Sequence, residues 1–307
     1  MDAISDRSSD PIALTGVRKA FGPLLAVDGV DLNVPRGELF GLIGHNGAGK
    51  STLFRIMLGL ASADAGTVQV AGCAVNGPEW RAARRRIGYL PEQLALYDNL
   101  NGRETLQFFA RLKGAPLAQI EPLLAQVGLG AAAGRAVRTY SKGMRQRLGL
   151  AQALLGEPQV LFLDEPSNGL DPQAIREFYE LLAALRSRGV TILITSHILA
   201  ELQQRVDRLA IMAAGKVVAQ GSVQGLREQL ALPLTLVLRA APELLREAAL
   251  AAGDSAEVQQ RHDGLHLHCE RTRKMDLLGR LAPLAARLDD LQIHEPSLED
   301  LYFGVRA

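Results

Sequence analysis

The sequence predicts an α/β domain built on a mixed sheet with parallel strands, followed by a small α+β domain. Short apolar runs of strand length alternate with helical patterns through most of the chain. One of these runs, 38–44, leads directly into a glycine-rich turn and a helical pattern, and the order of the elements changes after Gly225. Because near-continuous apolar strands that alternate with helices are typical of parallel strands covered on both faces, we expect such a sheet here.

The first domain is expected over residues 1–225. It begins with two partly alternating apolar runs and a Pro-Arg-Gly turn, which favour strands and a turn. From Trp80 to Gly156 apolar residues at helical spacing dominate, and we interpret that stretch as a helical insertion. In order, the ranges predicted before it are strands at 12–22, 24–34 and 38–44, a loop and helix at 45–60, and a strand at 66–72.

Strands and helices alternate again after the insertion, which indicates a return to the sheet. The predicted ranges are a strand at 158–166, a helix at 172–189, a strand at 190–197, a helix at 198–206 and strands within 208–221. The second domain, 226–307, shows a different order: strand 232–240, helix 242–253, hairpin 256–270, helix 271–288, strand 289–295 and a short tail. That order predicts a small ferredoxin-like α+β domain.

Composition and charge limit the classes of partner. The chain has 34 basic and 33 acidic side chains, so it lacks the broad positive charge that nonspecific nucleic-acid binding requires, and we expect no nucleic acid. Cys73 and Cys269 are too few for a disulfide framework, and the polar start of the chain lacks the apolar segment of a signal peptide. No apolar run approaches the roughly 20 residues that span a bilayer. We therefore expect a cytoplasmic chain that works at a membrane only through another polypeptide.

A glycine-rich motif between a predicted strand and a predicted helix is the strongest single signal. The sequence GHNGAGKS at 44–51 fits the phosphate-loop pattern G-x-x-x-x-G-K-S. Glycines let successive backbone N–H groups turn toward phosphate oxygens, Lys50 supplies a cation to the β and γ phosphates, and the Ser51 hydroxyl can ligate Mg²⁺. The predicted phosphate-binding residues are Gly44, His45, Asn46, Gly47, Ala48, Gly49, Lys50, Ser51 and Thr52.

Acidic residues at the end of a second apolar strand complete a predicted hydrolytic site. Asp164 and Glu165 follow VLFL, and two adjacent carboxylates there are costly unless they have partners. In a phosphate-loop protein Asp164 would hold Mg²⁺, while Glu165 would orient and deprotonate the attacking water. His197 ends a third apolar run. Because ligands in such sheets gather at the carboxyl ends of the strands, we interpret it as a sensor of the γ-phosphate.

The stretch YSKGMRQR, from Tyr140 to Arg147, resembles the signature motif LSGGQ of the ABC ATPases. The order of the phosphate loop, this stretch, FLDEP, NGLD and TSH matches that family over roughly 12–225. The resemblance implies ATP hydrolysis with Mg²⁺ in a homodimer that holds two ATP molecules between its subunits. Each ATP would lie between one subunit's phosphate loop and the other subunit's signature, where Ser141, Lys142 and Gly143 would contact it.

The resemblance implies further roles, position by position. Phe21 matches the aromatic residue that stacks on adenine, although a core phenylalanine fits the same pattern. Asp171, in the loop Asn168–Asp171, matches a loop that communicates between the two sites. In the so-called Q-loop Glu92 stands where the family usually has glutamine, and Gln93 follows it. Either side chain is a candidate contact to the nucleotide, and Gln93 is also a candidate ligand of Mg²⁺.

Partners follow from the same resemblance. A transmembrane permease would dock on the Q-loop and the helical insertion, which would place the chain on the cytoplasmic face of the inner membrane. The aromatic residues Tyr97, Phe108 and Phe109 would line that groove or belong to a helical core. The ending EPSLEDLYFGV and the stretch 140–156 are similar to ATPases of the NosF type, which implies maturation of the copper–sulfur centre of nitrous oxide reductase and a periplasmic accessory subunit.

The sequence also allows other functions. The same motifs occur in the ATPases of drug and other small-molecule exporters. A soluble ABC protein that does not transport would carry two nucleotide domains or a long coiled coil, and a phosphate-loop kinase or synthase would have an acceptor site in place of the signature. In the second domain His262, His266, His268 and Cys269 offer groups that suit copper or zinc. They lack a closed ligand spacing, so we expect them to be structural rather than metal ligands.

Overall fold

The computed structural model describes residues 10–196, 202–229 and 233–295. The chain divides into two compact units, residues 1–220 and residues 221–307. The boundary predicted from the sequence, after Gly225, is slightly later. The predicted helix at 198–206 lies in part, and the tail from 296 entirely, outside the described residues. Among the described helices none is long and apolar enough to cross a membrane.

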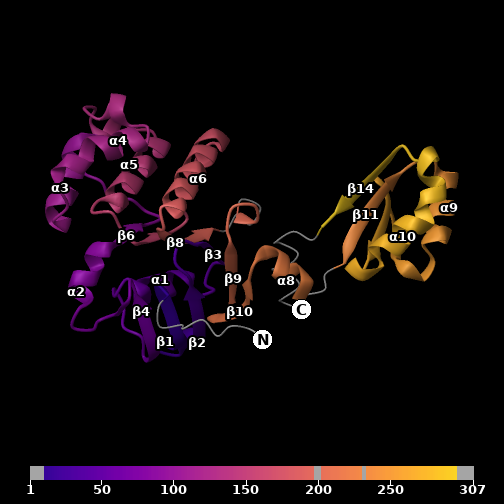
Figure 1. Ribbon diagram of the computed structural model, residues 1–307, viewed down its shortest axis with the longest axis horizontal. Helices are drawn as coiled ribbons and strands as arrows, with labels where there is room; N and C mark the ends of the chain where they lie inside the picture. Colours follow the sequence, from indigo (N-terminus) through magenta and orange to yellow (C-terminus); the bar gives the residue numbers. More distant parts are fainter. Residues whose placement is uncertain (1–9, 197–201, 230–232, 296–307) are drawn as a thin grey trace. The chain divides into compact units, whose positions relative to one another are not determined.

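An antiparallel sheet opens the first unit (Figure 1). Its strand order is β2-β1-β4-β5, and the close hairpin of β1 and β2 places Phe21 opposite Leu24. Buried residues alternate with exposed ones along β1, because only one face of this sheet packs on the core. The strands are β1 (Ile12–Phe21), β2 (Leu24–Val34), β4 (Ala65–Val70) and β5 (Cys73–Ala74).

A second sheet, of six strands, carries the order β10-β9-β3-β8-β7-β6. The pairs β9-β3, β3-β8, β8-β7 and β7-β6 are parallel, so the carboxyl ends of β3, β7 and β8 meet at one edge. The residues of these three strands are all buried, as expected for a sheet covered on both faces. The strands are β3 (Leu39–Gly44), β6 (Ile87–Leu90), β7 (Val160–Leu163), β8 (Thr191–Ser196), β9 (Arg208–Ala213) and β10 (Lys216–Gly221).

Helix α1 (Lys50–Met57) holds the two sheets together. Its buried residues Leu53, Phe54, Ile56 and Met57 belong to one hydrophobic cluster with side chains of both sheets, and Phe54 packs edge to face on Phe162 of β7. Helix α6 (Pro172–Ser187) contacts β3 and β8. Figure 1 shows α1 and α6 on opposite sides of the large sheet. The α1 helix, and therefore the loop before it, is fixed by packing on its apolar side.

The helices α3 (Gly102–Lys113), α4 (Ile120–Gln126) and α5 (Lys142–Leu154) pack on one another and form the expected helical region. The short helix α2 (Trp80–Ala83) comes before them. The prediction of a mainly helical stretch from 80 to 156 was wrong at one point, because β6 lies within it and pairs with β7. This strand has only four residues and follows an arginine run, so it is too short to show a period of its own.

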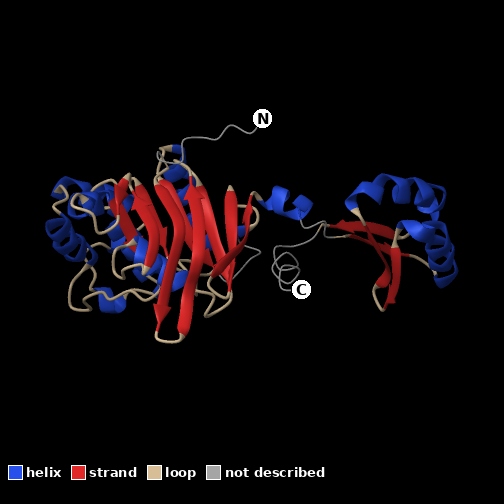
Figure 2. Cartoon of the chain, turned by 90° about the horizontal axis from the view of Figure 1, so that it is seen from below, coloured by secondary structure: helices blue, strands red, loops and turns tan. Residues whose placement is uncertain are grey.

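The second unit begins with α8 (Val223–Gln229) and then has the element order β-α-β-β-α-β of a ferredoxin-like domain. Its sheet is antiparallel with the order β12-β13-β11-β14, and α9 and α10 contribute Leu245, Ala248, Leu277 and Leu281 to its core. Figure 2 shows strands and helices of this unit as two layers. The elements are β11 (Leu234–Arg239), α9 (Pro242–Ala252), β12 (Glu257–Arg261), β13 (Gly264–Cys269), α10 (Lys274–Leu281) and β14 (Asp290–His294).

The start of α3 allows a test of local stability. The Asn101 side chain accepts a hydrogen bond from Glu104 N, and the Glu104 carboxylate accepts one from Asn101 N, each at 2.9 Å. Removing this capping box in Asn101→Ala should lower the free energy of unfolding by about 1 kcal/mol. Asn101→Asp should retain most of the stability, because an aspartate can accept the same hydrogen bond from Glu104 N. Urea unfolding of the two variants checks this, and an unchanged midpoint in Asn101→Ala would contradict it.

Candidate functional site

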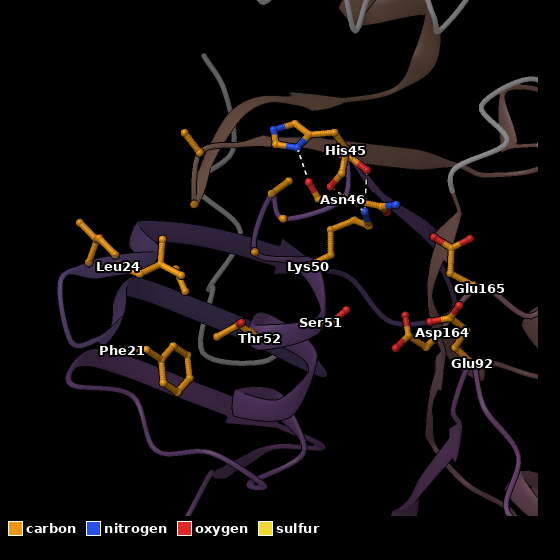
Figure 3. Close-up of a pocket in the computed structure, with 18 of the residues that line it drawn as sticks. Phe21, Leu24, His45, Asn46, Lys50, Ser51, Thr52, Glu92, Asp164 and Glu165 are labelled. Carbon is orange, nitrogen blue, oxygen red and sulfur yellow. Dashed lines mark hydrogen bonds between the residues drawn. The ribbon is translucent and has the colours of Figure 1, made fainter.

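A cavity of about 770 Å³ lies beside the loop between β3 and α1. Figure 3 shows its layout. Phe21 and Leu24 of the β1–β2 hairpin lie on one side, and the carboxylates of Glu92, Asp164 and Glu165 lie on the other. All the residues of the predicted phosphate loop line it: Gly44, His45, Asn46, Gly47, Ala48, Gly49, Lys50, Ser51 and Thr52. The structure thus brings the loop and the two acidic residues after β7 into one cavity.

The backbone of this loop requires glycine at two positions. Gly49 has φ of 104°, and a Cβ there would lie 2.3 Å from the carbonyl oxygen of Ala26. A Cβ on Gly44 would lie 2.6 Å from the carbonyl oxygen of Met212. Side chains at either position would push the loop away from β2 and β9. Gly49 is also the N-cap of α1, and it has no side chain that could cover the N–H groups of the first turn. The first residues of the helix, Lys50, Ser51 and Thr52, line the cavity, so their N–H groups are available to an anion there.

Lys50 is the buried cation of the cavity, with only 7% of its surface exposed. Its ammonium donates hydrogen bonds to the carbonyl oxygens of Gly44 at 2.5 Å and of His45 at 3.2 Å. Burial lowers the pKa of Lys50, and the nearby carboxylates of Glu165, Asp164 and Glu92 oppose that shift. The ammonium is thus held by backbone carbonyls at the end of β3. Its position depends on the loop and not on a flexible side-chain partner.

Asp164 and Glu165 are both positioned by Thr195 of β8. The Thr195 hydroxyl donates to the Asp164 carboxylate at 2.7 Å and accepts a hydrogen bond from the Glu165 backbone N–H at 2.9 Å. Glu165 has φ of 48°, a left-handed conformation that is rare for residues other than glycine and that often marks a functional position. Sequence reasoning missed Thr195, although a polar residue near the end of an apolar strand was a visible signal.

Burial raises the pKa of Asp164. The hydrogen bond from Thr195 opposes this shift, and the charges of Glu165 and Glu92 add to it. The ionised carboxylate is therefore destabilised in this cavity unless a cation lies near it. Carboxylate and hydroxyl oxygens are the ligands that Mg²⁺ prefers, and both Asp164 and Ser51 line the cavity. The residues present thus fit a magnesium ion that is bound together with a nucleotide.

The structure separates the two Q-loop candidates. Glu92 lines the cavity, whereas Gln93 lines a second hollow together with Leu94, Phe109 and Lys113. The expectation that Gln93 contacts the nucleotide or Mg²⁺ is therefore not met in this structure. The segment after β6 is irregular, and neighbouring side chains there point in different directions. Sequence spacing could not decide which of the two residues faces the cavity.

The other residues expected to contact the nucleotide lie outside this cavity. Ser141 is the N-cap of α5 and accepts a hydrogen bond from Met144 N at 3.2 Å; both Ser141 and Lys142 are exposed. Gly143 follows them in the first turn. Asp171 is the N-cap of α6, where its carboxylate accepts a hydrogen bond from Ala174 N at 2.8 Å. Within one chain the structure does not bring these residues to the phosphate loop.

Exposure decides between the alternatives for the aromatic residues. Phe21 is 50% exposed at the hairpin tip, so it is not the core phenylalanine that the sequence also allowed. Tyr97 and Phe108 are 53% and 37% exposed and contact each other edge to face, while Phe109 lines the second hollow. These side chains are available to a ligand or a partner. The sensor candidate His197 lies outside the described residues.

His266 and His268 of the second unit have hydrogen-bond partners within their own domain. His266 Nε2 lies 3.0 Å from an Asp263 carboxylate oxygen, and His268 Nδ1 lies 3.0 Å from the Thr235 hydroxyl. Cys269 belongs to the hydrophobic core, where burial raises the pKa of its thiol. Among the residues that the structure describes, no group of three or more His, Cys, Asp or Glu side chains is placed to hold a metal ion. His266 and His268 therefore have partners within their own domain, and the structural role expected for the whole cluster stays a prediction.

Comparisons with known proteins connect this geometry to a family. The family described as "ABC transporter" matches residues 27–168, which include the phosphate loop and Asp164 with Glu165. The daunorubicin resistance ATP-binding protein DrrA3 of Streptomyces coeruleorubidus is 37% identical over 300 residues, covering 95% of this chain and 94% of the relative. The Nod factor export ATP-binding protein I of Burkholderia lata is 37% identical over 298 residues and covers 95% of both chains.

Solved structures agree with this relationship. An ATP-binding subunit of an ABC transporter superposes with a TM-score of 0.65 at 33% identity, covering 71% of this chain and 92% of the other. A dimeric ATP-binding cassette with ADP and phosphate superposes with a TM-score of 0.63 at 25% identity, covering 69% of this chain and 98% of the other. The predicted fold class is confirmed. The chain belongs to the ATP-binding proteins of the ABC transporter family and is an ATPase whose activity is coupled to transport.

Proposed function

We propose that this chain is the ATP-hydrolysing subunit of an ABC exporter, and that two copies close around two ATP molecules to drive a transmembrane permease. One observation supports the proposal that the chain hydrolyses ATP. The loop after β3 and the end of β7 bring Lys50 and Asp164 with Glu165 to one cavity, together with donors from the phosphate loop, and Thr195 of β8 holds the two acidic residues in place. Binding of ATP would favour the closed dimer, and hydrolysis would release it.

The chemistry follows from the positions of the side chains. Lys50 and the loop N–H groups would neutralise charge on the β and γ phosphates. Ser51 and Asp164 would hold Mg²⁺, which would supply further charge neutralisation when bound. Glu165 would orient the attacking water and accept its proton, because its carboxylate faces the same cavity. His197 is proposed as a γ-phosphate sensor by resemblance, and Phe21 is proposed to stack on the adenine.

The signature residues favour a site shared between two copies. Ser141 and Lys142 are exposed, and neither they nor Gly143 line the cavity of their own chain. A Cβ on Gly143 would make only an ordinary contact of 3.5 Å with Leu170, so packing within the chain does not require glycine there. A phosphate from outside the chain would require glycine at this position, because a side chain there would keep the phosphate away from the N–H groups at the start of α5. Similarity to a dimeric cassette with ADP and phosphate supports this arrangement.

The membrane partner is proposed to dock beside α3. Tyr97 and Phe108 are exposed there, and the second hollow, of about 610 Å³, lies between α2, the Q-loop and α3. A permease that contacts this surface would sense movements of the Q-loop. The chain would then lie on the cytoplasmic face of the inner membrane, attached through that subunit. Asp171, near the cavity-lining Asn168, is proposed to couple the two ATP sites.

For the cargo we propose two candidates. The similarity of the stretch 140–156 and of the chain's ending to NosF-type ATPases favours maturation of the copper–sulfur centre of nitrous oxide reductase, with a periplasmic accessory subunit. The relatives described above are named instead for daunorubicin resistance and Nod factor export, which favours a small-molecule exporter. Both candidates use the same ATPase cycle, so the nucleotide site does not distinguish between them.

A deletion of the gene separates the two cargo candidates. If the chain serves maturation, nitrous oxide reductase from the deletion strain should lack its copper–sulfur centre, and its visible spectrum should show this loss. The wild-type gene should restore the spectrum, whereas a gene carrying Glu165→Gln should not. An unchanged reductase together with increased sensitivity to a small toxic compound would support the exporter and contradict the maturation role.

The role of Glu165 predicts a trapped state. Glu165→Gln keeps the shape of the side chain but removes its charge and basicity, so it should bind ATP and lose turnover by about 100-fold or more. Closed dimers should accumulate with ATP and Mg²⁺. Size-exclusion chromatography and phosphate release on the purified protein check both points. Hydrolysis at the wild-type rate in this variant would show that another group activates the water.

The phosphate loop offers a matched pair of variants. Gly49→Ala places a Cβ 2.3 Å from the Ala26 carbonyl oxygen at φ of 104°, so it should abolish ATP binding. Gly47 also has a positive φ, of 83°, but nothing lies within 4 Å of its added Cβ, so Gly47→Ala should bind ATP more weakly but measurably. Equilibrium dialysis with labelled ATP compares them. Equal affinities would contradict the packing argument.

A further inference from the structure

Three carboxylates and one lysine give the nucleotide cavity an acidic character. Glu92, Asp164 and Glu165 face it from one side, and Lys50 lies in the loop opposite (Figure 3). The Lys50 ammonium already donates to two backbone carbonyls. The triphosphate of ATP adds several negative charges to this cavity. Electrostatic repulsion between the nucleotide and the carboxylates is therefore built into the site.

Glu92 is the carboxylate that the family pattern does not call for, since glutamine is usual at this position. Glu92 lines the cavity, and its charge acts on two other residues that line it, Lys50 and Asp164. It opposes the lowering of the Lys50 pKa, and it adds to the raising of the Asp164 pKa. Gln93, its neutral neighbour, lines a different hollow. Replacing Glu92 by a neutral residue therefore changes the charge of the nucleotide cavity. A charged residue in place of Gln93 would lie in the other hollow.

We infer that Glu92 makes ATP binding conditional on a divalent cation, so that this chain binds ATP with Mg²⁺ and discriminates against metal-free ATP. The inference rests on the assignment of the cavity to ATP. A cation between the phosphates and the carboxylates turns the repulsion into attraction, since carboxylate oxygens are preferred ligands of Mg²⁺. Without a cation, the charge of Glu92 acts only against the nucleotide. Glu92 is thus a residue that determines specificity for the metal-bound form of the substrate.

The coupling between cation binding and ATP binding can be measured without ATP hydrolysis. If the cation strengthens ATP binding, ATP strengthens cation binding by the same factor, and Glu92 sets part of that factor. Glu92→Gln should therefore bind metal-free ATP more tightly than the wild-type chain does. Its gain in affinity on addition of Mg²⁺ should be correspondingly smaller. The isosteric amide keeps the shape of the exposed side chain, and thermal unfolding checks that the fold is unchanged.

The experiment measures the Kd of labelled ATP for the full chain by equilibrium dialysis, in Mg²⁺ and in EDTA, at one ionic strength. The ratio of the Kd in EDTA to the Kd in Mg²⁺ should fall about fivefold or more in Glu92→Gln. Gln93→Glu, which adds a carboxylate one residue away and outside the cavity, is the matched control and should keep the wild-type ratio.

Two results would overturn the inference while leaving the ATPase assignment intact. One is an unchanged ratio in Glu92→Gln. The other is a rise of the ratio in Gln93→Glu that is as large as its fall in Glu92→Gln, which would indicate a general effect of charge. A wild-type chain that binds no ATP even with Mg²⁺ would instead overturn the assignment of the cavity and the inference with it.

Discussion

The position of Lys50 is the constraint on which the rest of the site depends. Its ammonium lies against the carbonyl oxygens of Gly44 and His45 at the end of β3, inside a cavity where burial disfavours its charge. A buried cation of this kind is stable only if anions lie near it. The parallel sheet supplies them. Strands β3 and β7 both pair with β8, so Asp164 and Glu165 after β7 lie at the same edge of the sheet as the loop after β3.

The remaining parts of the first unit serve this arrangement. Helix α1 packs between the two sheets and fixes the loop before it, and Gly49 allows the loop to pass close to Ala26. Thr195 connects β8 to both acidic residues through one hydroxyl. The antiparallel hairpin of β1 and β2 brings Phe21 to the opposite wall. Packing thus fixes the phosphate end of the cavity, while an exposed hairpin tip forms the other end.

The sequence predicted those parts of the fold whose residues carry their own local signal. The phosphate loop, the acidic strand end and the β-α-β-β-α-β order of the second unit were all readable from spacing and period. Strand β6 was missed because four residues show no period, and Thr195 was missed because its role depends on a hydrogen bond across two strands. The choice between Glu92 and Gln93 depended on side-chain direction in an irregular segment, which no spacing encodes.

We propose that Ser141 of a second copy completes each ATP site. The most direct measurement is nucleotide occlusion in mixed dimers, with Ser141→Arg in one subunit and Lys50→Ala in the other, in a Glu165→Gln background and with the membrane partner. One composite site then carries both lesions, and the other pairs an intact loop with an intact signature. We expect occlusion to be lost in each homodimer and to return at one of the two sites in the mixed dimer. No recovery in assembled mixed dimers, or full occlusion in the Ser141→Arg homodimer, would contradict it.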